Sequence, residues 1–183
     1  MTFSVADFSA ELNSTGVIKL SSFDVTIFGP SSLDNDFGRQ LQLRCLDTEL
    51  PGRGAVLMEN NIFGVPRKIV ATSNVLNELN LRFIMSEKMS ERDYFEKWLD
   101  IILGNYRNED SSEMFLTGFY ADYIGNIEIT NYNDKGEKVL TTKILEAFPL
   151  NVGNIQMTWS DNAQIMIFPV TFTFRHYKNE TLS

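Results

Sequence analysis

The sequence contains very few of the residues on which metal sites, disulfides and histidine-based catalysis depend. Its 183 residues include a single cysteine, Cys45, and a single histidine, His176. One cysteine cannot form a disulfide within the chain, so folding does not depend on an oxidising compartment, and a reducing cytoplasm is the expected place of synthesis. Neither a Cys/His cluster nor a His-x-x-x-His spacing exists, so no metal site is predicted.

Basic residues are outnumbered, and long apolar runs are missing. The chain has 16 Lys and Arg against 24 Asp and Glu, which gives a formal net charge of −8. Proteins that grip nucleic acid through its phosphates have basic surfaces, so this class is disfavoured, whereas a protein past which nucleic acid slides is not. No run approaches the roughly 18 apolar residues of a membrane helix, and the acidic N-terminus is unlike a signal peptide.

Patterns for catalysis and cofactor binding are absent as well. Cys45 is expected to be a buried small hydrophobe without a base beside it, and His176 a strand-end residue without partners. The glycines at 29 and at 52–54 lack the Lys-Ser/Thr of a phosphate-binding loop. We therefore predict no catalytic residue, no metal and no cofactor, and an enzyme is the weakest of the function classes considered.

Apolar residues make up 43% and aromatic residues 12% of the chain, enough for a sizeable core. Alternation of apolar and polar residues is the dominant pattern, and it indicates β-strands. Turn residues at 133–136 and 160–162 predict two hairpins, and a short helix is expected at 6–12. The strands are expected at 23–27, 41–45, 68–71, 79–85, 127–130, from 139 onward, at 155–159 and at 164–177.

One substantial helix is predicted at 91–103. Ser90 is a suitable N-cap, Glu91 and Asp93 suit the first turn, and Gly104 is a stop. One side of this helix is apolar and is formed by Tyr94, Phe95, Trp98, Leu99 and Ile102. The elements together predict a single domain over 1–183 in the mainly β (α+β) class, with about seven or eight strands and one substantial helix.

The segment 48–66 is expected to be a long loop, because proline and glycine punctuate it. It also contains apolar residues, which are unusual in a loop, and long loops are often functional. Two interpretations stay open: docking on a partner, or packing of the loop against the protein's own core.

Several segments in a fixed order carry a resemblance to a known family. They are 44–52 (RCLDTELPG), 80–89 (NLRFIMSEKM) leading into 91–98 (ERDYFEKW), then 148–155 (FPLNVGNI), 158–162 (TWSDN) and 168–174 (FPVTFTF). This set resembles the tail tube proteins of contractile-tailed bacteriophages, over roughly residues 20 to 178. The sequence departs from the family pattern in an N-terminal segment, 1–20, that is longer than usual, and at 67–79.

The resemblance implies the tail tube fold, a β-sandwich or half-barrel flanked by one helix. It also implies a structural protein of the virion tail that is assembled in the host cytoplasm. Its subunits would form hexameric rings that stack into the inner tube of a contractile tail, the conduit for genome ejection. The implied partners are further copies of the chain, a sheath protein, baseplate or tube-initiator and tail terminator proteins, and the tape measure protein in the lumen. DNA would pass through without specific binding, and an acidic lumen wall would repel it.

Candidate site residues follow from this resemblance and concern interfaces alone. Leu50, Pro51, Val56, Leu57 and Phe63 are the candidates for contact with the adjacent ring. An acidic stripe on the predicted helix, Asp93, Glu96 and Asp100, is the candidate surface for the sheath. The alternative for the stripe is that it only keeps the helix soluble.

Two alternative functions remain. The first is a baseplate tube-initiator, or a tube-like protein of a related contractile injection system. The second is a soluble β-sandwich module that binds a carbohydrate or a peptide, suggested by aromatic residues clustered in one segment. These residues are Tyr106, Phe115, Phe119, Tyr120 and Tyr123. Aromatic clusters of this kind also occur in cores and interfaces.

Overall fold

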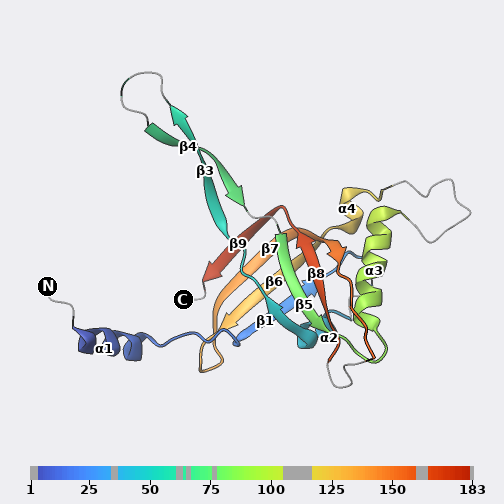
Figure 1. Cartoon of the computed structure of the whole chain (residues 1–183), viewed down its shortest axis with the longest axis horizontal. Helices are drawn as coiled ribbons and strands as arrows, with labels where there is room; N and C mark the ends of the chain where they lie inside the picture. The colour runs from blue at the N-terminus through green and yellow to red at the C-terminus, as the bar shows by residue number, and fades with distance from the viewer. Residues whose placement is uncertain are drawn as a thin grey trace, which may run out of the picture.

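The main element of the computed structural model is a seven-stranded antiparallel sheet (Figure 1). The structure describes residues 4–33, 37–60, 64, 67–75, 78–104, 117–159 and 165–181. The strand order is β1-β6-β7-β8-β5-β2, and β9 pairs with β7. The strands are β1 (Phe23–Phe28), β2 (Cys45–Thr48), β5 (Glu78–Ile84), β6 (Gly125–Tyr132), β7 (Lys138–Val152), β8 (Ile167–Thr173) and β9 (His176–Thr181).

A second, two-stranded sheet projects from the main one. It is a hairpin formed by β3 (Arg53–Asn60) and β4 (Arg67–Val75). The helices are α1 (Val5–Thr15), α2 (Gly38–Arg44), α3 (Ser90–Leu103) and α4 (Tyr120–Tyr123). In Figure 1 the hairpin and α1 lie at one end of the long axis of the molecule, and α3 lies at the other. The predicted mainly β class with a flanking helix is confirmed.

Strand β7 bends at Glu146 and so belongs to both halves of the sheet. Its first part pairs with β6 and β9, and its last part, from Phe148 to Val152, pairs with β8. Glu146 adopts a left-handed backbone with φ of 54°. Its carboxylate accepts a hydrogen bond from the Tyr120 hydroxyl at 2.8 Å and is ion-paired with Arg175 at 3.0 Å. Contacts from two other segments therefore hold the bend in place.

The core lies between one face of the sheet and α3. The predicted helix is confirmed, with Tyr94, Phe95 and Trp98 buried and Gly104 at its end, although Met89 rather than Ser90 is the cap residue. Phe172 of β8 meets Phe95 and Trp98 edge-on, with ring centroids 5.8 Å and 6.0 Å away. Perpendicular ring pairs of this kind place the positive edge of one ring against the negative face of another.

Two predicted strands are wrong. Residues 41–44 belong to α2, in which Leu41 is fully buried and Leu43 is 81% exposed. Phe37, four residues before Leu41, also packs against the core, and burial at this spacing is typical of a helix. Gln, Leu and Arg are also good helix formers, so local propensity agrees with this outcome. Residues 155–159 form no strand, since β8 pairs with β7 and β5 and not with this segment.

The expected loop at 48–66 is also wrong in its secondary structure, because residues 53–60 form β3. Its apolar run, Ala55–Met58, does not alternate with polar residues, so the usual signal of a strand with one buried face is missing. All described side chains of the hairpin are exposed, on both faces. The pattern failed because no face of this hairpin packs on the core.

Candidate assembly interfaces

The β3–β4 hairpin exposes several apolar side chains close together. Val56, Leu57 and Met58 are 44%, 55% and 50% exposed, and Ile69 and Val70 of the facing strand are 42% and 64% exposed. Isolated two-stranded hairpins have marginal stability in water. Neighbouring exposed apolar side chains of this kind are typical of protein–protein interaction sites, which makes the hairpin a candidate interface.

The strand register divides these side chains between two faces. Leu57 pairs with Val70 and Glu59 with Lys68, so these four residues share one face. Met58 pairs with Ile69, and the pair Asn60 and Arg67 lies two positions further along the same, opposite face. One face therefore presents an apolar pair next to the charged pair Glu59 and Lys68, and the other face presents an apolar pair next to Arg67.

The predicted ring-contact residues have different positions. Val56 and Leu57 lie on the hairpin, and Leu50, 50% exposed, lies just before it with the partly buried Pro51. Phe63 lies outside the described residues. The structure therefore brings four of the five candidates to one region, of which two are on the projecting element itself.

The edges of the main sheet differ in how they are covered. Along β1, α2 lies beside the strand, and the Gln42 amide donates a hydrogen bond to the Asp24 carboxylate. Strand β9 pairs with β7 on one side, and no described strand pairs with its other side. An unpaired strand edge is a template for a strand of another chain.

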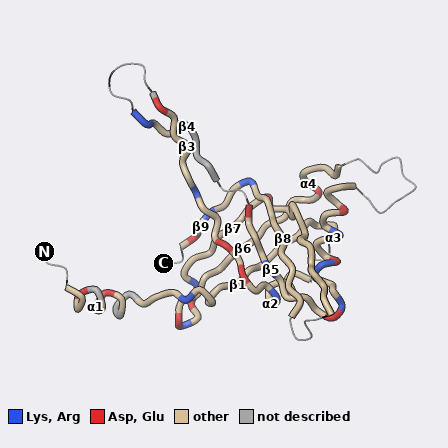
Figure 2. The backbone as a smooth tube through the Cα atoms, in the orientation of Figure 1, with Lys and Arg blue, Asp and Glu red and all other residues tan. Residues whose placement is uncertain are grey.

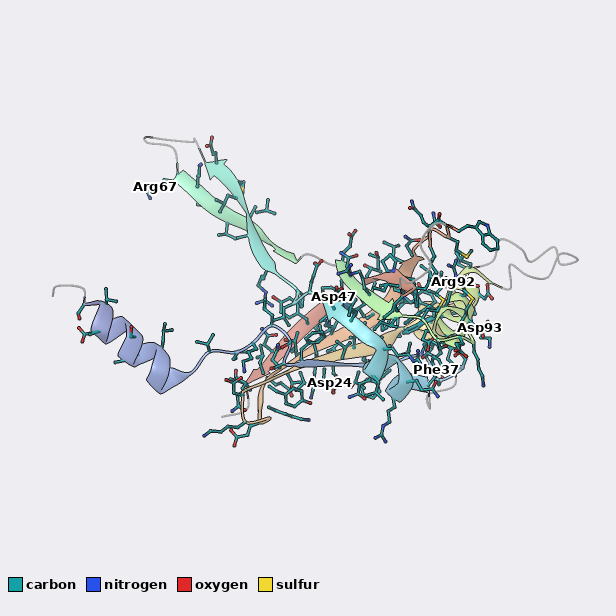
Figure 3. All side chains as sticks on the ribbon, turned by 60° about the horizontal axis from the view of Figure 1, so that its bottom comes forward. Asp24, Phe37, Asp47, Arg67, Arg92 and Asp93 are labelled. Carbon is teal, nitrogen blue, oxygen red and sulfur yellow. The ribbon has the colours of Figure 1, made fainter. Side chains whose placement is uncertain are left out.

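The predicted acidic stripe lies on α3, at the other end of the molecule from the hairpin. Figure 3 shows Arg92 and Asp93 at that end and Arg67 on the hairpin. Asp93 is ion-paired with Lys97 and Glu96 with Arg92, both at 2.6 Å, while Asp100 is partly buried. The stripe is thus a surface of alternating charge rather than a purely acidic one.

Part of the aromatic segment that suggested a sugar-binding module is involved in ring packing. Tyr123 lies between Tyr120 and Phe148, with ring centroids 5.5 Å and 5.1 Å away, while Phe119 is 82% exposed. Tyr106 and Phe115 lie outside the described residues. Among the described rings of this segment, Tyr123 is therefore engaged in packing at the corner of the sheet, whereas Phe119 and Tyr120 remain exposed.

Cys45 and His176 offer no reactive pair. Burial, with the neighbouring Asp47 and Asp24 carboxylates, raises the pKa of the Cys45 thiol to about 12, so the thiol stays protonated at neutral pH. His176 is the first residue of β9, as predicted for a strand end. No cluster of metal-ligating side chains occurs in the described part of the chain. None of the described helices has the length and apolarity needed to cross a membrane.

Comparison with known proteins identifies relatives at the level of family and fold. The model of the family described as phage tail tube protein matches residues 5–180. No curated protein sequence matches the chain. The following solved structures share the fold at low sequence identity.

One is the sheath/tube terminator of an extracellular contractile injection system in the extended state, with a TM-score of 0.64 and 16% identity, covering 91% of this chain and 98% of that chain. A second is the cap of the anti-feeding prophage, a tube-terminating cap, with a TM-score of 0.63 and 15% identity, covering 91% of this chain and 93% of that chain. A third is the sheath–tube complex of an extracellular contractile injection system, with a TM-score of 0.60 and 14% identity, covering 99% of this chain and 100% of that chain.

Proposed function

Because the match over residues 5–180 shows that the chain belongs to the phage tail tube protein family, a family of structural proteins and not of enzymes, we propose that it forms stacked hexameric rings of the inner tube of a contractile phage tail. The observation that carries this proposal is the β3–β4 hairpin, which exposes an apolar pair on each of its two faces. A surface of this kind needs other copies of the chain to cover it.

Ring formation is supported by the main sheet. The free side of β9 lies on one edge, while the path of strands ends in β1 and β2. When an edge of one copy pairs with a different edge of the next copy, the contact is heterologous, and such contacts close into rings if the rotation allows. Sheets joined in this way leave no exposed strand edge, which suits a closed tube.

Stacking of the rings is assigned to the hairpin and its base. Leu50, Pro51, Val56 and Leu57 are the residues that would contact the adjacent ring, together with Phe63. The hairpin projects away from α3, so its contacts do not compete with those made by the helix (Figure 1). One protein could therefore bind an adjacent ring at one end and the sheath at the other.

The sheath surface is assigned to α3, with Asp93, Glu96 and Asp100. Because Arg92 and Lys97 are interleaved with them, a complementary surface on a sheath protein would also alternate in charge. Alternating charges fix the register of two surfaces and reject mismatched partners more than they add affinity. One of the similar structures is itself a sheath–tube complex, which agrees with a sheath partner.

The polar face of the sheet is the surface that would line the lumen. It contains Glu128, Lys143 and Lys178, which lie opposite one another on β6, β7 and β9, and Glu180, which is ion-paired with Lys143 at 2.8 Å. A wall of paired charges lacks the basic surface with which proteins grip phosphates. DNA and the tape measure protein would therefore pass without specific binding, as a conduit for genome ejection from the virion requires.

A tube-initiator of the baseplate, or a tube-like protein of an injection system, is the second candidate function. The similar structures include a tube terminator, a tube-terminating cap, a baseplate and a sheath–tube complex. A main tube protein polymerises without a fixed length when no terminator is present, whereas an initiator forms a ring that does not stack on itself.

Electron microscopy of the purified full chain at rising concentration tests both functions. Hollow tubes support the main tube protein, and rings that never stack support the initiator. A monomer at every concentration, also in the presence of preformed tube ends or baseplates from the same tail, would contradict both.

A further inference from the structure

The N-terminal helix α1 stands apart from the body of the molecule. Val5 and Leu12 are seven residues apart, so they share one side of the helix, and they are 72% and 41% exposed. Asp7 and Glu11, four residues apart, share another side, and α1 has no basic residue. The helix is thus amphipathic and acidic, and its described apolar side chains lie open to solvent.

The linker after α1 is tied to the turn between β6 and β7. Lys19 is ion-paired with Asp134 at 3.0 Å, and the Tyr132 N–H donates to the Ser22 carbonyl at 2.9 Å. Figures 1 and 3 both show α1 and the hairpin at the same end of the molecule but apart from each other. In this structure α1 therefore lies apart from the hairpin of its own chain, and the linker is attached to the body at Lys19 and Ser22.

The hairpin has the opposite charge to α1. Its strands contain three basic residues, Arg53, Arg67 and Lys68, and one acidic residue, Glu59, a net charge of +2, whereas α1 has a net charge of −2 from Asp7 and Glu11 (Figure 2). On one face of the hairpin Lys68 is opposite Glu59. On the other face Arg67 is opposite Asn60, beside the apolar pair Met58 and Ile69.

From this complementarity we propose that α1 of one protomer packs on the β3–β4 hairpin of a neighbouring copy. Val5 and Leu12 cover Met58 and Ile69, and the acidic side of the helix faces Arg67. The opposite hairpin face, with Leu57 and Val70, stays available for the adjacent ring. We call this contact between α1 of one copy and the hairpin of the next the clasp. The proposal rests on the assembly proposed above.

Disulfide crosslinking of assembled protein tests the contact directly. In a Cys45→Ala background, Leu12→Cys combined with Met58→Cys places one cysteine on α1 and one on the proposed face. Mild oxidation is expected to give covalent dimers and longer ladders on a non-reducing gel, because a disulfide needs the two Cα atoms within about 7 Å. Leu12→Cys with Val70→Cys, on the other face of the hairpin, is the matched control and should give at least fivefold less product.

A charge exchange tests the electrostatic part. Asp7→Lys with Glu11→Lys is expected to raise the protein concentration needed for assembly roughly tenfold, and added Arg67→Glu should recover most of that loss. Tubes or rings that form normally, without the crosslink and without any effect of the charge changes, would overturn the clasp but leave the proposed function intact. A crosslink confined to single chains would also overturn it. Failure of the unaltered protein to assemble would instead count against the proposed function, and with it the clasp.

Discussion

Arg44, the last residue of α2, is ion-paired with Glu91 in the first turn of α3, with 3.0 Å between Nε and Oε1. The Glu91 side chain is only 1% exposed. Its second carboxylate oxygen accepts hydrogen bonds from the backbone N–H and the hydroxyl of Ser86, at 3.0 Å and 2.7 Å. One carboxylate therefore joins α2, the end of β5 and α3.

Replacement of this carboxylate should destabilise the fold. Glu91→Gln keeps an acceptor for Ser86 but removes the charge that compensates Arg44, so the free energy of unfolding should fall by about 1–3 kcal/mol. Urea denaturation at neutral pH measures the change. Glu96→Gln is the matched control on the same helix, because its exposed pair with Arg92 should contribute less than about 1 kcal/mol. Equal effects of the two variants would show that the buried pair has no special role.

The same carboxylate should make stability dependent on acid pH. Burial alone would raise the pKa of Glu91, but the hydrogen bonds from Ser86 and the charge of Arg44 lower it below its ordinary value. A carboxylate whose pKa is lowered in the folded state stabilises the fold at pH values above its unfolded-state pKa of about 4.3. This stabilisation is lost as the pH falls through the folded-state pKa. Wild-type protein should therefore lose more stability than Glu91→Gln below about pH 4. Parallel stability curves for the two proteins would contradict this.

Gly125 should not tolerate a side chain. A Cβ at this position would lie 2.3 Å from the Phe28 carbonyl oxygen and 2.8 Å from the Trp98 ring. The Trp98 indole is fully buried and donates to the Tyr123 carbonyl at 2.7 Å, so it has little freedom to move. Gly125→Ala is expected to lower stability by about 1–3 kcal/mol in thermal or urea unfolding.

Gly136 provides a comparison for that variant. It lies in the β6–β7 turn with φ of 78° and no atom near the position of a Cβ. Asn tolerates this backbone conformation, so Gly136→Asn should change stability by less than about 1 kcal/mol. A similarly small loss of stability in Gly125→Ala would show that the core around Gly125 can rearrange to accept a side chain.

Cys45 should react slowly in the native protein. Its raised pKa, about 12, leaves little thiolate at pH 8. Because the thiolate is the reactive form, alkylation by iodoacetamide should proceed roughly a hundredfold more slowly than in urea-unfolded protein. Mass spectrometry of timed samples measures both rates. Comparable rates in the two states would show that the thiol is not shielded.

Polar substitution on the hairpin should separate assembly from folding. Leu57→Ser with Val70→Ser changes two exposed side chains that do not contact the core, so unfolding should shift by less than about 0.5 kcal/mol. Stacking of rings should be lost in electron micrographs. Leu43→Ser, at an 81% exposed position on α2, is the control and should still give tubes. Normal tubes from the double variant would remove the hairpin face from the stacking interface.

Charge reversal on α3 should affect the sheath alone. Asp93→Lys with Asp100→Lys is expected to weaken co-sedimentation of tubes with the sheath protein of the same tail at least tenfold, while tube formation stays unchanged. Raising the salt concentration should weaken wild-type binding in the same direction, because exposed charges are screened. Unaltered sheath binding would leave the stripe with a role in solubility only.

The sequence by itself determined the elements whose side chains divide cleanly between core and solvent. Strands β1, β5, β6 and β8 alternate, because one face of each packs on the core. Helix α3 followed from its apolar side and from Gly104 at its end. The same local signals, in their order along the chain, supported the resemblance to tail tube proteins, and the family match over residues 5–180 confirms it.

Only the tertiary structure decided the bend of β7, helix α2 and the β3–β4 hairpin, because local sequence patterns do not specify the contacts that these elements make or lack. The bend of β7 at Glu146 depends on Tyr120 and Arg175, and no local pattern specifies them as partners. The helix at 38–44 buries Leu41 and Gly38 and leaves Leu43 exposed, whereas the apolar residues Leu41, Leu43 and Cys45 alternate along the sequence as in a strand. The described side chains of β3 and β4 are all exposed, so only the folded structure shows that this apolar segment is a projecting hairpin and not a loop packed on the core.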